Sequence, residues 1–177
     1  AETARSLGSG GSVAVALGSA AGGDGLVGFE AGQRHSTSRL LDGEYPKVAK
    51  IFPSSSETEA VIKTSDLIEA VKRVSLVAER NTPVRLRFSA DQVDIEAGTG
   101  DDAQASEAVS ARVEGPGLDI AFNPAFLLDG LGALHTPYAR MSFTAPLKPA
   151  MITGQAEEDG SADLQYRYVL QPVRLTS

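Results

Sequence analysis

Few side chains in this sequence have the type and spacing that catalysis or metal binding requires. The chain has no cysteine, and its two histidines, His35 and His135, lie far apart in the sequence. A thiolate nucleophile, a disulfide and a cysteine-ligated metal are therefore excluded. The acidic pair Asp101 and Asp102 lacks the ligand order of a calcium loop. These residues predict a binding or scaffold role rather than an enzyme, with no metal and no cofactor.

The glycine-rich and acidic stretches do not change that prediction. Residues 22–25 are rich in glycine but are predicted to join two strands, whereas a phosphate cradle joins a strand to a helix. The nucleophile-elbow motif of the hydrolases is absent from the sequence. Residues 157–160 are acidic and are predicted to form a solvated loop.

Residues 166–175, near the end of the chain, are the strongest candidate for a binding element. Their side chains alternate between two faces, one with Tyr166, Tyr168 and Leu170 and the other with Arg167, Val169 and Gln171. Pro172 cannot donate to a sheet ladder, so the strand is predicted to end there. Residues 173–175 are apolar for a chain terminus. Two interpretations remain open: a last strand with a ragged end, or a tail that lines a groove for a partner.

The length and hydrophobic content of the chain limit the classes of protein to which it can belong. The chain has 177 residues, 42% of them hydrophobic, which suits one domain or one and a half. No stretch approaches the ~20 apolar residues of a membrane span, and the first residues do not resemble a signal peptide. We therefore expect a cytoplasmic location and no membrane partner. The chain begins without Met, which fits a processed protein or a fragment.

Charge is distributed unevenly along the chain. The net charge of −7 argues against non-specific coating by nucleic acid. Basic side chains nevertheless gather between Lys63 and Arg87, while acidic ones dominate between Asp91 and Asp119. The basic run forms either a solvated surface or a mildly basic face on an acidic body.

The order of predicted elements repeats. Residues 57–113 are predicted to form a strand, a helix and three strands, and residues 118–171 follow the same order. Two such units predict one α+β domain of antiparallel sheets with both helices on one face. Residues 1–41 resemble the same unit without its first strand, with a helix over residues 1–7 and strands over 13–17, 26–30 and 33–41. We therefore expect the C-terminal portion of a longer protein.

Each predicted helix has a buried stripe and a capping signal. The first helix is predicted from Asp66, with Glu69 completing a capping box, to about Glu79. Its stripe comprises Leu67, Val71, Val74 and Ala78. The second helix follows Asn123 and Pro124, and its stripe comprises Leu127, Leu131 and Leu134. Leu76 lies among polar residues, which indicates a contact beyond the domain's own core.

Four stretches of the chain resemble the bacterial DNA sliding clamp, the beta subunit of DNA polymerase III. They are residues 40–53, 66–80, 121–129 and 168–175, and the composition is similar to that of actinobacterial proteins. The resemblance implies a DNA-clamp fold. Residues 1–53 would be the C-terminal half of the middle domain plus the interdomain link, and residues 57–177 would be the C-terminal (third) domain.

The resemblance also implies a function and its partners. Clamps of this family are non-catalytic processivity factors that encircle duplex DNA as head-to-tail homodimers. They tether the replicative polymerase, the clamp loader and other proteins that carry a short clamp-binding motif. The matching groove residues are Pro46, Lys50, Ile51, Asn123, Phe126, Leu147, Pro149, Val169, Gln171, Pro172, Val173 and Arg174. Gln171 departs from the family pattern, which has Met at that position.

The remaining matches concern DNA and the ring. Lys72, Arg73 and Arg80 are the DNA-facing candidates, unless their helix face is only solvated. Leu76 and Val77 match the edge that joins one subunit to the next. Two alternatives remain: a clamp paralogue or variant whose altered groove evades or sequesters a groove ligand, and an unrelated α+β interaction domain. We expect Val169, Gln171, Pro46 and Phe126 to converge on one cleft, and the groove assignment is wrong if they do not.

Overall fold

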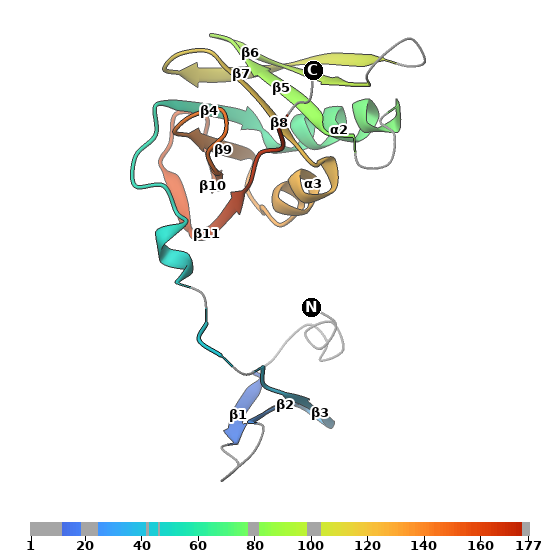
Figure 1. Cartoon of the computed structure of the whole chain (residues 1–177), viewed down its shortest axis with the longest axis vertical. Coiled ribbons are helices and arrows are strands. Elements are labelled where there is room, and N and C mark those ends of the chain that lie inside the picture. Colours follow the sequence, from blue (N-terminus) through green and yellow to red (C-terminus); the bar gives the residue numbers. More distant parts are fainter. Residues whose placement is uncertain are drawn as a thin grey trace. The chain divides into compact units, whose positions relative to one another are not determined.

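The computed structural model describes residues 12–18, 25–41, 43–45, 47–77, 82–98 and 104–174 (Figure 1). The chain divides into two compact units, Ala1–Pro46 and Lys47–Ser177. The segment 47–53, expected at the end of the first domain, belongs to the second unit in this division. The assignment of residues 1–53 to half of a clamp domain remains a prediction. No helix of the described residues is long and apolar enough to cross a membrane.

The first unit is a small antiparallel sheet whose strands follow one another in sequence. The turn between its second and third strands uses Gly32 at a φ of 60°, where a side chain would be strained. The unit does not cover all of its own apolar side chains, and Leu17, for example, is 73% exposed. The predicted helix over residues 1–7 lies outside the described ranges. The strands are β1 (Ala14–Gly18), β2 (Leu26–Ala31) and β3 (Arg34–Arg39), close to the predicted ranges.

The second unit begins with a 3₁₀ turn in the link and continues with the predicted repeat. The link turn is η1 (Val48–Lys50). The first repeat comprises β4 (Thr58–Lys63), α2 (Thr64–Val74), η2 (Ser75–Val77), β5 (Val84–Phe88), β6 (Gln92–Ala97) and β7 (Ala105–Glu114). The second comprises β8 (Leu118–Phe122), α3 (Pro124–Gly132), β9 (Tyr138–Phe143), β10 (Ala150–Gln155) and β11 (Ala162–Leu170). The predicted order of elements is confirmed in both repeats.

The start of α2 differs from the prediction. The helix begins at Thr64, directly after β4, and its N-cap is Lys63, which makes no side-chain capping bond. The Thr64 N–H donates instead to the Pro137 carbonyl at 2.8 Å. The predicted capping box of Asp66 and Glu69 is therefore wrong, because the strand runs into the helix without a connecting loop. The capping role of Asn123 is confirmed, since its side-chain oxygen accepts from the Ala125 N–H at 2.9 Å.

Within the described residues of the second unit, eight strands form one sheet, in the order β11-β10-β9-β4-β7-β6-β5-β8. The repeats are joined at the middle of the sheet, where β4 pairs with β7 on one side and with β9 on the other. Strand β7 is long enough to pair with β6 through its first half and with β4 through its second. This arrangement leaves β8 and β11 at the two ends of the sheet.

The core lies between the sheet and the two helices, which pack against each other (Figure 1). The predicted stripes are confirmed: Leu67 and Val71 of α2 and Leu127 and Leu131 of α3 are completely buried. Burying one such side chain contributes about 1.5–3 kcal/mol. Val74 is also buried, while Ala78, the last predicted stripe residue of α2, is not among the described residues.

Candidate functional site

The C-terminal segment runs along the outer edge of the sheet. Strand β11 ends at Leu170, which is buried in the core. The chain then continues past exposed Gln171 and buried Pro172 to Val173. The Val173 N–H donates to the carbonyl of Ala121 in β8 at 2.8 Å. This bond attaches the segment to the end strand of the sheet, so the terminus is not a ragged end as far as Val173.

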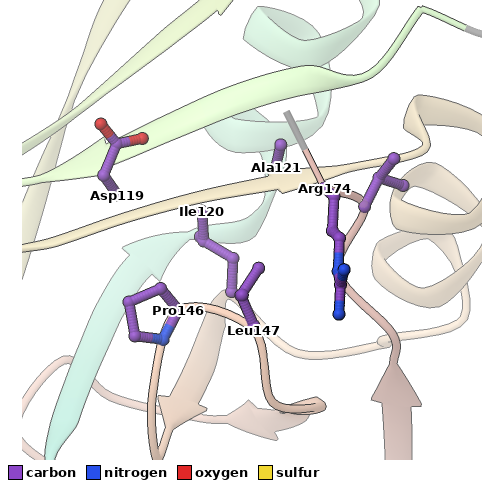
Figure 2. Close-up of a pocket in the computed structure, with 7 residues that line it drawn as sticks. Asp119, Ile120, Ala121, Pro146, Leu147 and Arg174 are labelled. Carbon is purple, nitrogen blue, oxygen red and sulfur yellow. The ribbon is translucent and has the colours of Figure 1, made fainter. Parts of the chain in front are cut away.

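A pocket of about 440 Å³ opens where this segment meets β8 and the β9–β10 connection. Figure 2 shows Pro146 and Leu147 on that connection, Ile120 beside them, and Arg174 across the opening. Leu147 is 58% exposed and Val173 is 38% exposed, so both can be covered by a ligand. The lining residues are Asp119, Ile120, Ala121, Pro146, Leu147, Val173 and Arg174.

One polar side of the pocket is already neutralised by charge pairing. The Arg85 Nε lies 2.7 Å from Asp119 Oδ1, and Arg87 Nε lies 3.9 Å from Asp119 Oδ2. The hydrogen bonds from Arg85, with the positive charge of both arginines, lower the pKa of Asp119 below its usual value although partial burial opposes this. Asp119 therefore remains a carboxylate at neutral pH and contributes a fixed, paired charge to the rim.

The second helix is anchored beside the C-terminal strand. The Tyr168 hydroxyl of β11 donates to the Phe126 carbonyl of α3 at 3.1 Å. The Tyr168 ring lies so close to Gly130 that a Cβ there would meet it at 2.5 Å. Burial is the main cause that raises the pKa of Tyr168, with Asp129 adding to it. The Phe126 side chain remains 56% exposed at the surface.

The structure brings together only part of the predicted groove. Leu147, Val173 and Arg174 line the pocket described above. Sequence reasoning missed Asp119, Ile120, Ala121 and Pro146, because nothing in the pattern of 118–122 shows that this strand lies at the end of the sheet. Other predicted residues do not line that pocket, and their role in a groove remains a prediction. These are Lys50, Ile51, Asn123, Phe126, Pro149, Val169, Gln171 and Pro172, while Pro46 lies at a position that the structure does not describe.

The predicted DNA-facing residues differ in how their charges are engaged. Lys72 is exposed on α2, and no ion pair to it appears among the described residues. Arg73 pairs with Glu107 through both Nε, at 3.0 Å, and Nη2, and with Glu69 at 3.4 Å. The hydrogen bonds to Glu107 are the main cause that raises the pKa of Arg73. Arg80 falls in the undescribed segment 78–81.

The predicted subunit edge carries a strongly exposed apolar side chain. Leu76 of η2 is 84% exposed, as its position among polar residues indicated. Val77 is half-buried and packs against the core. Over the described part of the chain, no group of three or more His, Asp or Glu side chains could hold a metal ion.

Comparison with known proteins identifies the family. The family model of the DNA polymerase III beta subunit, C-terminal domain, matches residues 49–167. The Beta sliding clamp of Streptomyces coelicolor is 51% identical over 99% of this chain and 46% of its own length. The Beta sliding clamp homolog GriR of Streptomyces muensis is 43% identical over 97% of this chain and 45% of its own. The chain thus spans about half the length of these relatives.

Solved structures agree with the sequence relatives. The sliding clamp of Bacillus subtilis superimposes with a TM-score of 0.73 at 32% identity, over 85% of this chain and 39% of that one. A Pseudomonas aeruginosa clamp described as bound to griselimycin has a TM-score of 0.73 at 26% identity, over 86% of this chain and 42% of that one. These likenesses confirm the predicted DNA-clamp fold. The chain belongs to the family of the DNA polymerase III beta subunit, C-terminal domain.

Proposed function

We propose that this chain is part of a DNA sliding clamp, a non-catalytic processivity factor that encircles duplex DNA as a head-to-tail homodimer. The observation that carries the proposal is the pocket at the C-terminal segment, formed by Leu147, Val173 and Arg174 in a chain of the clamp family. The chain spans only about half of its relatives, so the activity is proposed for the complete protein. A cytoplasmic location goes with this function.

The pocket suits the anchor side chain of a short peptide. Leu147, Val173 and Pro146 supply apolar walls, while Asp119 and Arg174 supply a polar rim. Sites of this kind gain affinity from the buried apolar anchor and orientation from a few polar groups. The replicative polymerase, the clamp loader and other clamp-motif proteins would bind here. The predicted residues that do not line this pocket would extend the groove, together with parts of the complete protein.

The griselimycin-bound clamps of Pseudomonas aeruginosa and Bartonella birtlesii support a ligand site on this fold. The variant with an altered groove remains a second candidate. The observation that favours it is Gln171, whose amide side chain is exposed on the C-terminal segment. The higher identity to the Streptomyces coelicolor clamp than to the GriR homolog favours the ordinary clamp.

A pair of leucines offers a matched test of the pocket. Leu147 lines the pocket and is 58% exposed. Leu164 of β11 is 60% exposed and is not one of the residues that line the pocket. Leu147→Asp places a charge where an apolar anchor would bind, so we expect the affinity for a clamp-motif peptide to fall about tenfold or more. Leu164→Asp should leave the affinity unchanged. Isothermal titration calorimetry measures both, and equal affinities for the two variants would rule out the pocket as the peptide site.

A further inference from the structure

A cation from the sheet covers an aromatic ring of the link. The Arg167 guanidinium carbon of β11 lies 4.7 Å from the centre of the Phe52 ring. A guanidinium at this distance is attracted to the negative face of the ring. Phe52 is half-buried, while the preceding Ile51 is 51% exposed. The link therefore contacts β11 through Phe52 and leaves Ile51 at the surface.

Arg167 differs from most arginines of this unit in its partner. Arg73, Arg85, Arg112 and Arg140 each pair with at least one carboxylate. No carboxylate pairs with Arg167 within the ranges that the structure describes. The Phe52 ring is thus a partner of the guanidinium that does not compete with a carboxylate of the described residues.

The chain is attached to the sheet again directly after the link, at residues 56 and 57. The Glu57 N–H donates to the Phe143 carbonyl at 2.8 Å, and the Ser56 hydroxyl donates to Glu59 at 2.6 Å. Between residues 47 and 52, the backbone bonds are those of the 3₁₀ turn itself, such as Ile51 N–H to the Val48 carbonyl at 2.9 Å. The contact of Phe52 with Arg167 is thus a tertiary attachment directly beside Lys50 and Ile51 in the sequence.

Strand periodicity connects this attachment with the proposed groove. Arg167 and Val169 lie on the same face of β11, about 7 Å apart along the strand. Phe52 is therefore docked over the face that carries Val169. We propose that Arg167 is a positioning residue that fixes the link over β11 and so holds Lys50 and Ile51 in place for a peptide ligand. The inference rests on the proposed peptide-binding function.

Two measurements on the intact protein test this role. The first is hydrogen exchange of the Lys50 and Ile51 amides, which reports local opening of the link. The second is the affinity for a clamp-motif peptide. Arg167→Gln removes the cation, and Phe52→Leu removes the ring but keeps an apolar side chain. An exposed cation–π contact corresponds to about a two- to fivefold change in an equilibrium constant. In each variant we therefore expect amide exchange to be faster by about that factor and the peptide affinity to be lower by about the same factor.

The pattern across variants identifies the contact itself. Arg167→Lys keeps a cation that can face the ring and should restore most of the protection. The combination of Arg167→Gln with Phe52→Leu should be no worse than the more severe single variant, because the contact is already lost. Arg112→Gln removes an exposed cation that pairs with Glu114 and serves as the control, with no expected change at the link.

Each outcome has a separate meaning. Unchanged exchange of the link amides in Arg167→Gln would overturn the attachment, whatever the peptide does. Faster exchange with unchanged peptide affinity would overturn the positioning role. Failure of the unmodified protein to bind the peptide would count against the proposed function, and the exchange data would still decide whether Arg167 holds the link.

Discussion

At the scale of single residues, neighbouring positions of the C-terminal segment differ in burial and polarity. Leu170 lies in the core, and Pro172 is also buried. Gln171, between them, is exposed and presents an amide to the solvent. An amide buried by an apolar ligand loses hydrogen bonds to water and needs new partners. A methionine at this position would instead adapt its flexible thioether to the ligand surface.

Gln171→Met tests whether this residue sets ligand preference. If Gln171 contacts the ligand, we expect the variant to bind an apolar clamp-motif peptide about three- to tenfold more tightly, because the desolvation cost of the amide disappears. Calorimetric titration of the variant and the unmodified protein under identical conditions measures the change. Gln165→Met, a substitution of an exposed glutamine on β11, serves as the control. Identical affinities for the Gln171→Met variant and the unmodified protein would remove any special role for this position.

At the scale of secondary-structure elements, a polar network stabilises the loop that joins β10 and β11. Arg140 donates to Glu59 at 2.5 Å, to the Gln155 side-chain oxygen at 2.7 Å and to the Gly160 carbonyl at 3.2 Å. Gln155 is completely buried and donates to the carbonyls of residues 157 and 158. The acidic loop predicted at 157–160 is thus fixed to the sheet by side chains that bond its backbone.

Glu59 makes this network sensitive to acid. The hydrogen bond from Ser56 is the main cause that lowers the pKa of Glu59 below its usual value, and Arg140 adds to it despite partial burial. A carboxylate with a lowered pKa in the folded state stabilises the fold above its unfolded pKa, near 4.5. That stabilisation is lost as the pH falls through the folded-state pKa.

Glu59→Gln should therefore lower the free energy of unfolding at pH 7 by about 1–3 kcal/mol, because Arg140 loses its charged partner. The stability of the variant should also fall less steeply than that of the unmodified protein below about pH 4.5. Urea unfolding at several pH values measures both effects. Glu114→Gln removes an exposed pair with Arg112 and should change stability by less than about 1 kcal/mol. If the stability of Glu59→Gln falls as steeply with acid as that of the unmodified protein, other carboxylates determine the loss of stability at low pH.

The same scale shows what the sequence could predict. The repeat and the buried faces of both helices were predictable, because 3.6-residue and two-residue periodicities are local signals. The start of α2 was not, since the absence of a loop after Lys63 depends on how β4 enters the sheet. The pocket residues 119–121 were not predictable either. Their place in the pocket depends on the position of β8 at the end of the sheet, which is a property of the tertiary fold.

At the scale of the whole molecule, a clamp that slides must hold DNA through few and weak phosphate contacts. The net charge of −7 limits such contacts to local basic positions. On α2, the charge of Arg73 is engaged by Glu107 and Glu69, whereas Lys72 is exposed. A lysine with no carboxylate partner among the described residues is the better candidate to contact a phosphate.

The two neighbouring cations therefore give unequal predictions for the complete ring. If α2 faces the DNA, Lys72→Ala should shorten the lifetime of the clamp on circular DNA and reduce the salt dependence of its retention by about one phosphate contact. Arg73→Ala should have a smaller effect if its charge stays engaged by Glu107 and Glu69 and does not reach a phosphate. Retention assays at several salt concentrations measure both variants. Equal retention of Lys72→Ala and the unmodified ring would show that this face of α2 does not contact DNA, and a larger loss in Arg73→Ala would show that its ion pairs open when DNA binds.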